Sequence, residues 1–167
     1  MIRKQALVTG AASGLGLELC RLLAADSHDL VMVDKDGDGL EKSARSIRET
    51  YGGEARILVK DLGTNRAADQ LFAEVEKLEF DILINSAGFG LFGFLTETDW
   101  GMEEAMLQLH VLNLTRLTKL VVQKMVRRGK GRIMNVSSLA ALQPGPLMNV
   151  YYASKSYIHF FSEALAN

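Results

Sequence analysis

The chain has 167 residues, a formal net charge of −1 and a hydrophobic content of 48%. This length is enough for a single domain with a substantial core, and the near-neutral charge gives no indication of the basic surface that favours nucleic acids or anionic membranes as partners. No apolar run approaches the ~20 residues of a membrane helix and the N-terminus lacks a signal-peptide pattern, so we expect a cytoplasmic protein without membrane contact.

The cysteine and the histidines indicate neither a disulfide nor a metal site. Cys20 is the single cysteine, and Leu19, Leu22 and Leu23 around it predict that it packs on the inner side of a helix. The three histidines stand apart from cysteine and acidic residues at metal-ligand spacing, so no metal is expected.

A glycine-rich turn follows the first expected strand, which includes residues 6–8. Gly10, Gly14 and Gly16 lack Cβ atoms, so this backbone can adopt positive φ and approach a ligand closely. The helix after it would direct free N–H groups and its positive dipole end at an anion such as a pyrophosphate. The turn lacks the Lys-Ser/Thr ending of a P-loop, which argues against a nucleoside triphosphatase. A glycine turn that holds no ligand is the alternative.

The next two expected strands, 29–33 and 55–59, are each followed by an acidic residue. A helix over about 15–25 precedes the strand 29–33, so the first two strands should be parallel. Asp34 stands where a carboxylate could accept hydrogen bonds from the ribose of a dinucleotide. Ordinary strand-end or turn aspartates are the alternative for both Asp34 and Asp61.

Two amphipathic helices are expected on either side of the third strand. The inner face of the first is predicted to consist of Leu40, Ala44, Ile47 and Tyr51. The inner face of the second, which Thr64 is expected to cap, is predicted to consist of Ala68, Leu71, Phe72, Val75 and Leu78.

The fourth expected strand, 81–84, leads into small and polar residues at 85–88. Small residues just past a central strand let a ligand lie against the edge of the sheet, while the Asn85 amide can join neighbouring strands. The glycine- and phenylalanine-rich loop 89–94 favours an apolar pocket, with core packing as the alternative.

A long helix is expected from Trp100 to Arg128, with an apolar face broader than one core requires. That face is predicted to consist of Ala105, Met106, Leu109, Leu112, Leu117, Leu120, Val121 and Met125. The surplus indicates contact with a second subunit, and a wide core stripe is the alternative.

The fifth expected strand, 132–136, delivers Ser138 to the same sheet edge as the glycine turn. Residues four apart on a helix share a face, so Tyr151 and Lys155 should be neighbours. A cation beside a phenol stabilises the phenolate and makes the tyrosine a usable acid or base. Spacing alone leaves Tyr152 open as the partner of Lys155.

These motifs together resemble the short-chain dehydrogenase/reductase family, in family order and over essentially the whole chain. The turn Thr9-Gly10-x-x-x-Gly14-x-Gly16 is similar to its glycine motif, and Tyr151-x-x-x-Lys155 to its Tyr-x-x-x-Lys motif. The segment 85–88 resembles its Asn-Asn-Ala-Gly signature, with Ser86 in place of the second asparagine.

The resemblance implies hydride transfer between a nicotinamide dinucleotide and an alcohol or ketone. It implies that Tyr151 is the catalytic tyrosine, that Lys155 also binds the nicotinamide ribose, and that Ser138 bonds the substrate oxygen. Asn113 would support a proton-relay water; a buried helix asparagine bonded to backbone is the alternative. The implied cofactor-binding residues are Thr9, Gly10, Ser13, Gly14, Leu15, Gly16, Asp34, Asp61, Leu62, Asn85, Ala87, Gly88, Tyr151 and Lys155.

The expected fold is a doubly wound α/β domain with a parallel sheet in the order 3-2-1-4-5 and helices on both faces. NAD is the expected cofactor, with NADP as the alternative, because Asp34 would repel a 2′-phosphate. A dinucleotide-binding sensor without turnover and an oligomeric scaffold are the rival functions. The substrate is not specified by the sequence.

Family members commonly form a two-fold interface, which here implies a homodimer through residues 100–128 and 151–166. They also continue past the tyrosine-bearing helix into a sixth strand, a mobile substrate loop and a seventh strand. This chain stops at Asn167. It is therefore expected to be part of a longer chain, with a natural fragment of weak activity as the alternative.

Overall fold

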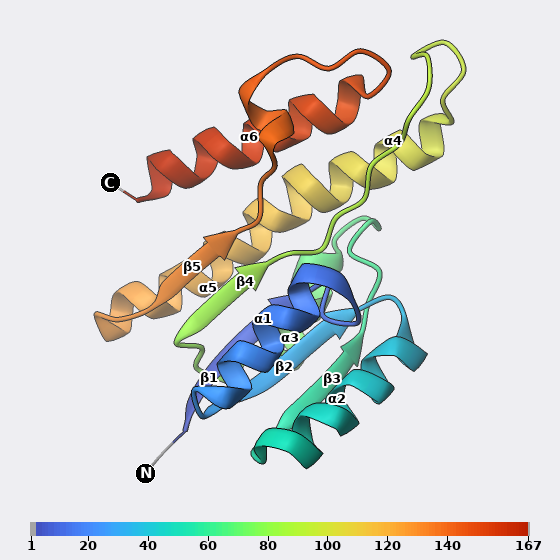
Figure 1. Ribbon diagram of the computed structural model, residues 1–167. Coiled ribbons are helices and arrows are strands. Elements are labelled where there is room, and N and C mark those ends of the chain that lie inside the picture. Colours follow the sequence, from blue (N-terminus) through green and yellow to red (C-terminus); the bar gives the residue numbers. More distant parts are fainter. Residues whose placement is uncertain (1–2, 167) are drawn as a thin grey trace.

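The computed structural model describes residues 3–166, in which strands and helices alternate along the chain (Figure 1). The strands are β1 Lys4–Thr9, β2 His28–Asp34, β3 Ala55–Val59, β4 Ile82–Asn85 and β5 Arg132–Asn135. The α-helices are α1 Gly14–Ala25, α2 Gly37–Tyr51, α3 Ala67–Val75, α4 Trp100–Leu107, α5 Leu114–Arg128 and α6 Asn149–Leu165. A π-helix, η1 Gln108–Asn113, joins α4 to α5, and a 3₁₀-helix, η2 Leu139–Leu142, follows β5.

The strands form one parallel sheet in the order β3-β2-β1-β4-β5, which confirms the predicted topology. Thr9, at the end of β1, lies opposite Val33 of β2 and Asn85 of β4. The carboxyl ends of the three central strands therefore meet at one edge, where the strand order reverses between β1 and β4. That reversal is where open α/β sheets bind their ligands.

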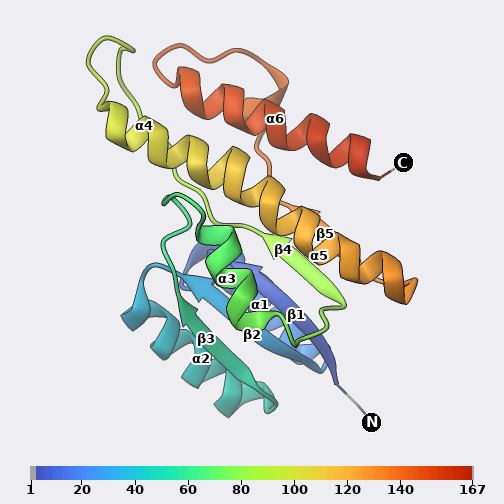
Figure 2. The same cartoon turned by 180° about the vertical axis from the view of Figure 1, so that it is seen from behind.

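Helices cover both faces of the sheet (Figures 1 and 2), and alternating side chains of the strands belong to two separate cores, one on each face. Ala6 and Val8 pack on the side covered by α1 and α2, together with Cys20. Leu7 packs on the other side, against residues of α3 and α5. This period of two on a strand buried on both faces explains why β1 reads as a continuous apolar run.

Three details of the first helices differ from expectation. Leu22 is 68% exposed, because it lies on the opposite side of α1 from the fully buried Cys20. Tyr51 is 38% exposed at the end of α2 rather than buried in its inner face. Thr64 does not cap α3: the helix begins after Arg66, and the Thr64 hydroxyl donates to the Asp61 carbonyl at 2.9 Å.

The long helix is present, but its buried side is more polar than predicted. Leu112, assigned to the apolar face, is 56% exposed. The buried positions include His110 and Asn113 of η1 and Thr118 of α5, each with a hydrogen-bonding partner. Apolar residues alone do not identify every buried position of a helix, because a polar side chain that forms hydrogen bonds can be buried with little loss of free energy.

Within residues 3–166, no helix has the length and apolar content needed to cross a membrane.

Candidate active site

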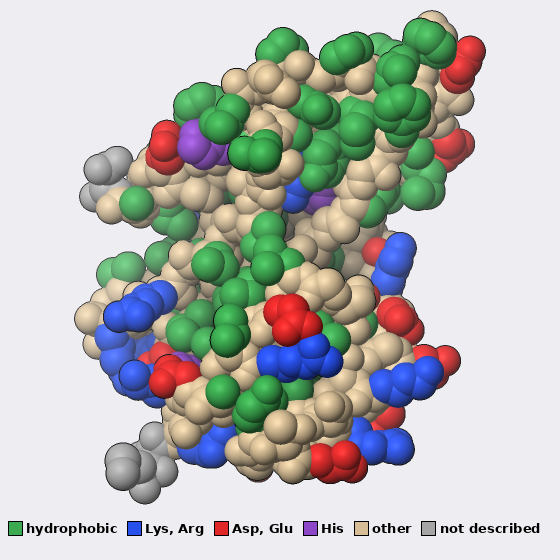
Figure 3. Space-filling model, viewed as in Figure 1, with side chains coloured by type: hydrophobic (Ala, Val, Ile, Leu, Met, Phe, Trp, Pro, Cys, Tyr) green, Lys and Arg blue, Asp and Glu red, His purple; other side chains and the backbone are tan. Residues whose placement is uncertain are grey.

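A cleft of about 350 Å³ opens at the carboxyl ends of the central strands, between the glycine turn and the segment after β4. Figure 3 shows this side of the molecule hollowed between the sheet and the part that carries α6, with basic and histidine side chains inside the hollow. The predicted cofactor residues that line the cleft are Gly10, Ser13, Gly14, Leu15, Gly16, Asp34, Asp61, Leu62, Ala87 and Gly88.

The glycine turn has a backbone that side chains would block. Gly10 and Gly14 have positive φ values of 70° and 54°. A Cβ atom on Gly16 would lie 2.0 Å from the Gly10 carbonyl oxygen, and one on Gly10 would lie 2.8 Å from Ala87. The glycines therefore let α1 start against the turn and let the turn pack on the segment after β4, leaving an N-terminus that fits a pyrophosphate.

Thr9 supports this cleft from below rather than lining it. Its side chain is buried, and Oγ1 accepts hydrogen bonds from the Ser86 and Ala87 N–H groups at 3.1 and 3.2 Å. Thr9 thereby fixes the segment after β4 against the glycine turn.

Asp34 and Asp61 stand at the rim of the cleft with their carboxylates held by backbone. Asp34 accepts from the Ala12 N–H and the Asp36 N–H, both at 3.1 Å. Asp61 accepts from the Gly63 N–H at 2.8 Å. Each carboxylate keeps lone pairs free, so both residues can accept a hydrogen bond from the adenosine part of a dinucleotide.

Asn85 joins strands, as its position predicted. Its Nδ2 donates to Asn135 Oδ1 at 2.8 Å and to Thr118 Oγ1 at 3.0 Å. Asn135 in turn donates to Ser162 Oγ at 2.9 Å. This partly buried chain of amides and hydroxyls ties β4, β5, α5 and α6 together.

The two serines after β5 have separate tasks. Ser137 Oγ donates to the Lys155 carbonyl at 2.9 Å and so anchors α6. Ser138 begins η2, and its Oγ accepts from the Ala140 N–H at 3.1 Å. The Ser138 hydroxyl hydrogen has no acceptor among the described residues, so it is free to bond a substrate oxygen.

Tyr151 and Lys155 lie one turn apart on α6. The Lys155 Nζ is 5.7 Å from the centre of the Tyr151 ring and donates to the Val136 carbonyl at 3.1 Å. Lys155 is only 5% exposed, and burial lowers the pKa of its ammonium group. A cation placed beside a phenol in this way stabilises developing phenolate charge.

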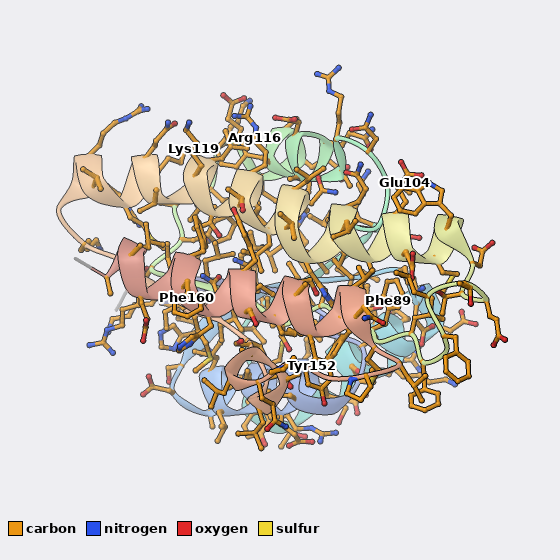
Figure 4. The ribbon with its side chains drawn as sticks, turned by 90° about the horizontal axis from the view of Figure 1, so that it is seen from above. Phe89, Glu104, Arg116, Lys119, Tyr152 and Phe160 are labelled. Atoms are coloured by element: carbon orange, nitrogen blue, oxygen red, sulfur yellow. The ribbon has the colours of Figure 1, made fainter. Side chains whose placement is uncertain are left out.

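The Tyr152 side chain packs away from Lys155. Its ring lies against Gly145, where a Cβ atom would be 2.1 Å from Cζ, and it lines a separate cavity with Pro144 and Phe160. Figure 4 shows Tyr152 beside the η2 segment. The structure therefore brings Tyr151, and not Tyr152, to Lys155.

The Asn113 side chain bonds the backbone of the loop between β3 and α3. Its Oδ1 accepts from the Ala68 N–H at 2.9 Å, and its Nδ2 donates to the Leu62 and Thr64 carbonyls at 2.9 and 2.8 Å. Both amide hydrogens are used on backbone, so this side chain holds the loop between β3 and α3 in place. This arrangement matches the alternative of a buried asparagine bonded to backbone.

His110, three residues earlier on η1, is the side chain that sequence reasoning missed. It is fully buried, its ring centre is 6.0 Å from that of Tyr151, and its Nδ1 is 2.9 Å from Ser154 Oγ. In the sequence, the histidines were considered only as metal ligands, by their spacing to cysteine and acidic residues, and that spacing gives no information on a buried histidine beside Tyr151. The available signal was a histidine within the buried stripe of a helix, three positions from an asparagine on the same side.

The family model for short chain dehydrogenases matches residues 4–167. The chain belongs to this family. Among curated proteins, the very-long-chain 3-oxoacyl-CoA reductase of Anas platyrhynchos is 31% identical over 96% of this chain and 53% of its own length. The 7beta-hydroxysteroid dehydrogenase of Collinsella aerofaciens is 31% identical over 96% of this chain and 61% of its own length.

The solved structures agree with this placement. A 7beta-hydroxysteroid dehydrogenase has a TM-score of 0.94 and 30% identity, over 98% of this short-chain dehydrogenase and 63% of its own chain. A short-chain dehydrogenase from Sphingobium yanoikuyae in complex with NADPH has a TM-score of 0.92 and 30% identity, over 97% and 64%. The chain thus spans between about half and two thirds of the length of these relatives. The predicted family is confirmed.

Proposed function

We propose that this short-chain dehydrogenase transfers a hydride between a nicotinamide dinucleotide and an alcohol or ketone, with Ser138, Tyr151 and Lys155 as its acid–base group. The observation that carries the proposal is Lys155, buried beside Tyr151 and next to Gly88, which lines the cleft. Its relatives carry the names reductase and dehydrogenase, which supports the same reaction class.

The cleft is proposed to hold NAD(P), which supplies the hydride-transfer chemistry when bound. The start of α1 would bind the pyrophosphate, and Asp34 would accept hydrogen bonds from the adenosine ribose. Two solved neighbours are described as NADPH complexes, which supports this cofactor class. Lys155 would donate to the nicotinamide ribose from below the cleft.

In the reducing direction, the Ser138 hydroxyl would donate a hydrogen bond to the substrate carbonyl oxygen and polarise it. The Tyr151 hydroxyl would give its proton to the same oxygen as the alcohol forms. The ammonium group of Lys155 would stabilise the resulting phenolate. In the oxidising direction, the Tyr151 phenolate would take the proton back.

The substrate class is proposed from the relatives and the surface beside the site. The names of the relatives cover 3-oxoacyl-CoA and hydroxysteroid conversion, and one solved neighbour is specific for bulky ketones. Apolar side chains on the segment after β4 and on η2 are largely exposed, at 71% for Phe92, 83% for Leu139 and 68% for Leu142. A carbonyl on a large apolar skeleton fits that surface.

A homodimer through α4, α5 and α6, a location in the cytoplasm, and the rival of a sensor without turnover stay predictions. The test of function is the change in nicotinamide absorbance when the protein meets NADH or NADPH and a panel of bulky ketones. We expect turnover in the wild type and none in Tyr151→Phe. Tight cofactor binding without turnover over the whole panel would favour the sensor, and no binding would favour a scaffold.

A further inference from the structure

The π-helix η1 carries a buried histidine into the region between the cleft and α6. His110 is fully buried, and Phe89 and Tyr151 enclose its ring, with ring centres 6.2 and 6.0 Å away. Nothing in the proposed reaction uses this imidazole. A buried polar ring without a task in packing or catalysis calls for an explanation, because its desolvation costs free energy.

Hydrogen bonds fix which ring nitrogen carries the proton. Ser154 Oγ donates its single hydrogen to the Tyr151 carbonyl at 2.8 Å. The same Oγ lies 2.9 Å from His110 Nδ1, so it must accept there and Nδ1 must be the donor. The neutral ring therefore has its free lone pair on Nε2.

That lone pair is buried and has no partner among the described residues. It faces the same small space as the ammonium group of Lys155. A methyl group placed on Gly88 would lie 2.8 Å from His110 Nε2 and 3.4 Å from Lys155 Nζ. The missing side chain of Gly88 thus leaves room for one small group, such as a water, between an acceptor and a donor.

The surroundings keep this ring neutral. Burial first, and the charge of Lys155 second, lower the pKa of His110 to about 3. The titratable groups that face it are Lys155 and Tyr151, both on α6. The segment 86–90 packed on its other side contributes no ionisable residue, and Glu103 on α4 is held by the Thr98 hydroxyl at 2.7 Å.

We infer that His110 is a positioning residue for Lys155: its Nε2 accepts a hydrogen bond from one water in the space beside Gly88, and that water accepts a hydrogen bond from the Lys155 ammonium group. The inference rests on the proposed function for its consequence in catalysis. An acceptor in this place favours the charged form of Lys155 and holds Nζ beside the Tyr151 ring. Lys155 can then keep its charge although it is almost fully buried.

The direct test is a pH titration of Lys155 in the cofactor-free protein, monitored by NMR. The lysines are labelled with ¹³C at Cε, and the Lys155 signal is assigned as the one that disappears in Lys155→Arg. His110→Phe keeps a ring of similar shape without the acceptor, so the Lys155 pKa should fall by roughly one unit. His110→Gln can offer an amide oxygen near the Nε2 position and should restore most of the shift. His159→Gln, on the exposed side of α6, is the control for loss of a histidine.

A second variant guards against a failure of His110→Phe to fold. Gly88→Ala places a methyl group 2.8 Å from Nε2 and 3.4 Å from Nζ, in the space proposed for the water, while leaving both side chains present. Like His110→Phe, it should lower the pKa of Lys155. An unchanged Lys155 titration in both variants, or equal shifts in His110→Phe and His110→Gln, would overturn the inference, because the ring would then only fill space.

Turnover gives an independent readout. With a substrate from the ketone panel, His110→Phe should lower kcat by about tenfold to a hundredfold and move its alkaline limb to lower pH, with KM for the ketone little changed. His110→Gln should retain most of the rate. If the wild type has no turnover at all, the proposed function fails, and the Lys155 titration still decides the role of His110.

Discussion

The Lys155 ammonium group lies 5.7 Å from the centre of the Tyr151 ring and bonds the Val136 carbonyl, so one buried cation serves both the end of β5 and the phenol of α6. Removing the phenol and removing the cation should therefore have different effects. Tyr151→Phe should abolish turnover, a loss of about a hundredfold or more, while cofactor affinity stays nearly unchanged. Lys155→Ala should damage both, because the ammonium is also proposed to bind the nicotinamide ribose.

Steady-state kinetics and calorimetric titration with cofactor measure these two effects separately. Tyr152→Phe is the matched control, since its ring packs against Gly145 and away from Lys155. A larger loss of turnover in Tyr152→Phe than in Tyr151→Phe would mean that the site is assigned one residue out of register.

Cofactor preference should depend on Asp34. Its carboxylate is fixed by the Ala12 and Asp36 N–H groups at the rim of the cleft, where it would repel a 2′-phosphate. We expect tighter binding of NAD(H) than of NADP(H) by calorimetry. Asp34→Ser keeps an acceptor and removes the charge, so it should raise the relative affinity for NADP(H) by about tenfold.

Asp38→Ser, in the first turn of α2, removes an acidic residue nearby and should leave the preference as it is. Tighter binding of NADP(H) by the wild type would contradict the prediction. In that case Lys35, next to Asp34 in the sequence, would be the residue to replace next.

Asn113 should matter for stability. In Asn113→Ala, the Ala68 N–H and the Leu62 and Thr64 carbonyls lose their buried partner. We expect the free energy of unfolding to fall by about 2–4 kcal/mol, measured by urea denaturation. The exposed Asn149→Ala serves as the control. A stability equal to that of the wild type together with a large loss of turnover would instead support the catalytic role predicted for Asn113.

The predicted homodimer depends on apolar side chains that one copy of the chain leaves exposed. Leu112 is 56% exposed, Val126 73% and Phe160 64%, on the helices assigned to the interface. Light scattering at micromolar concentration should give the mass of a dimer, and Phe160→Asp should shift it towards the monomer. Val59→Asp, on β3 at the opposite edge of the sheet, also introduces an aspartate at an apolar residue that is 53% exposed, and it should leave the dimer intact.

The sequence by itself determined the order of the elements and the place of the cleft. Strand β3 has the predicted bounds Ala55–Val59, and the glycine turn stands at the start of α1 as its spacing indicated. These features are local: buried strands need consecutive apolar residues, and a close approach of backbone needs glycine at particular positions. Once strands and helices alternate, right-handed crossovers leave few sheet orders to choose from.

Tertiary structure alone decided what the polar side chains of the long helix do. Asn113 and His110 share the buried side of η1, yet one bonds backbone 45 to 51 residues away and the other Ser154, 44 residues away. Helical spacing predicts which residues share a side of the helix, but it does not predict which atoms of other elements pack there. Because α6 and the loop after β3 pack against η1, Asn113 bonds the backbone and His110 bonds Ser154.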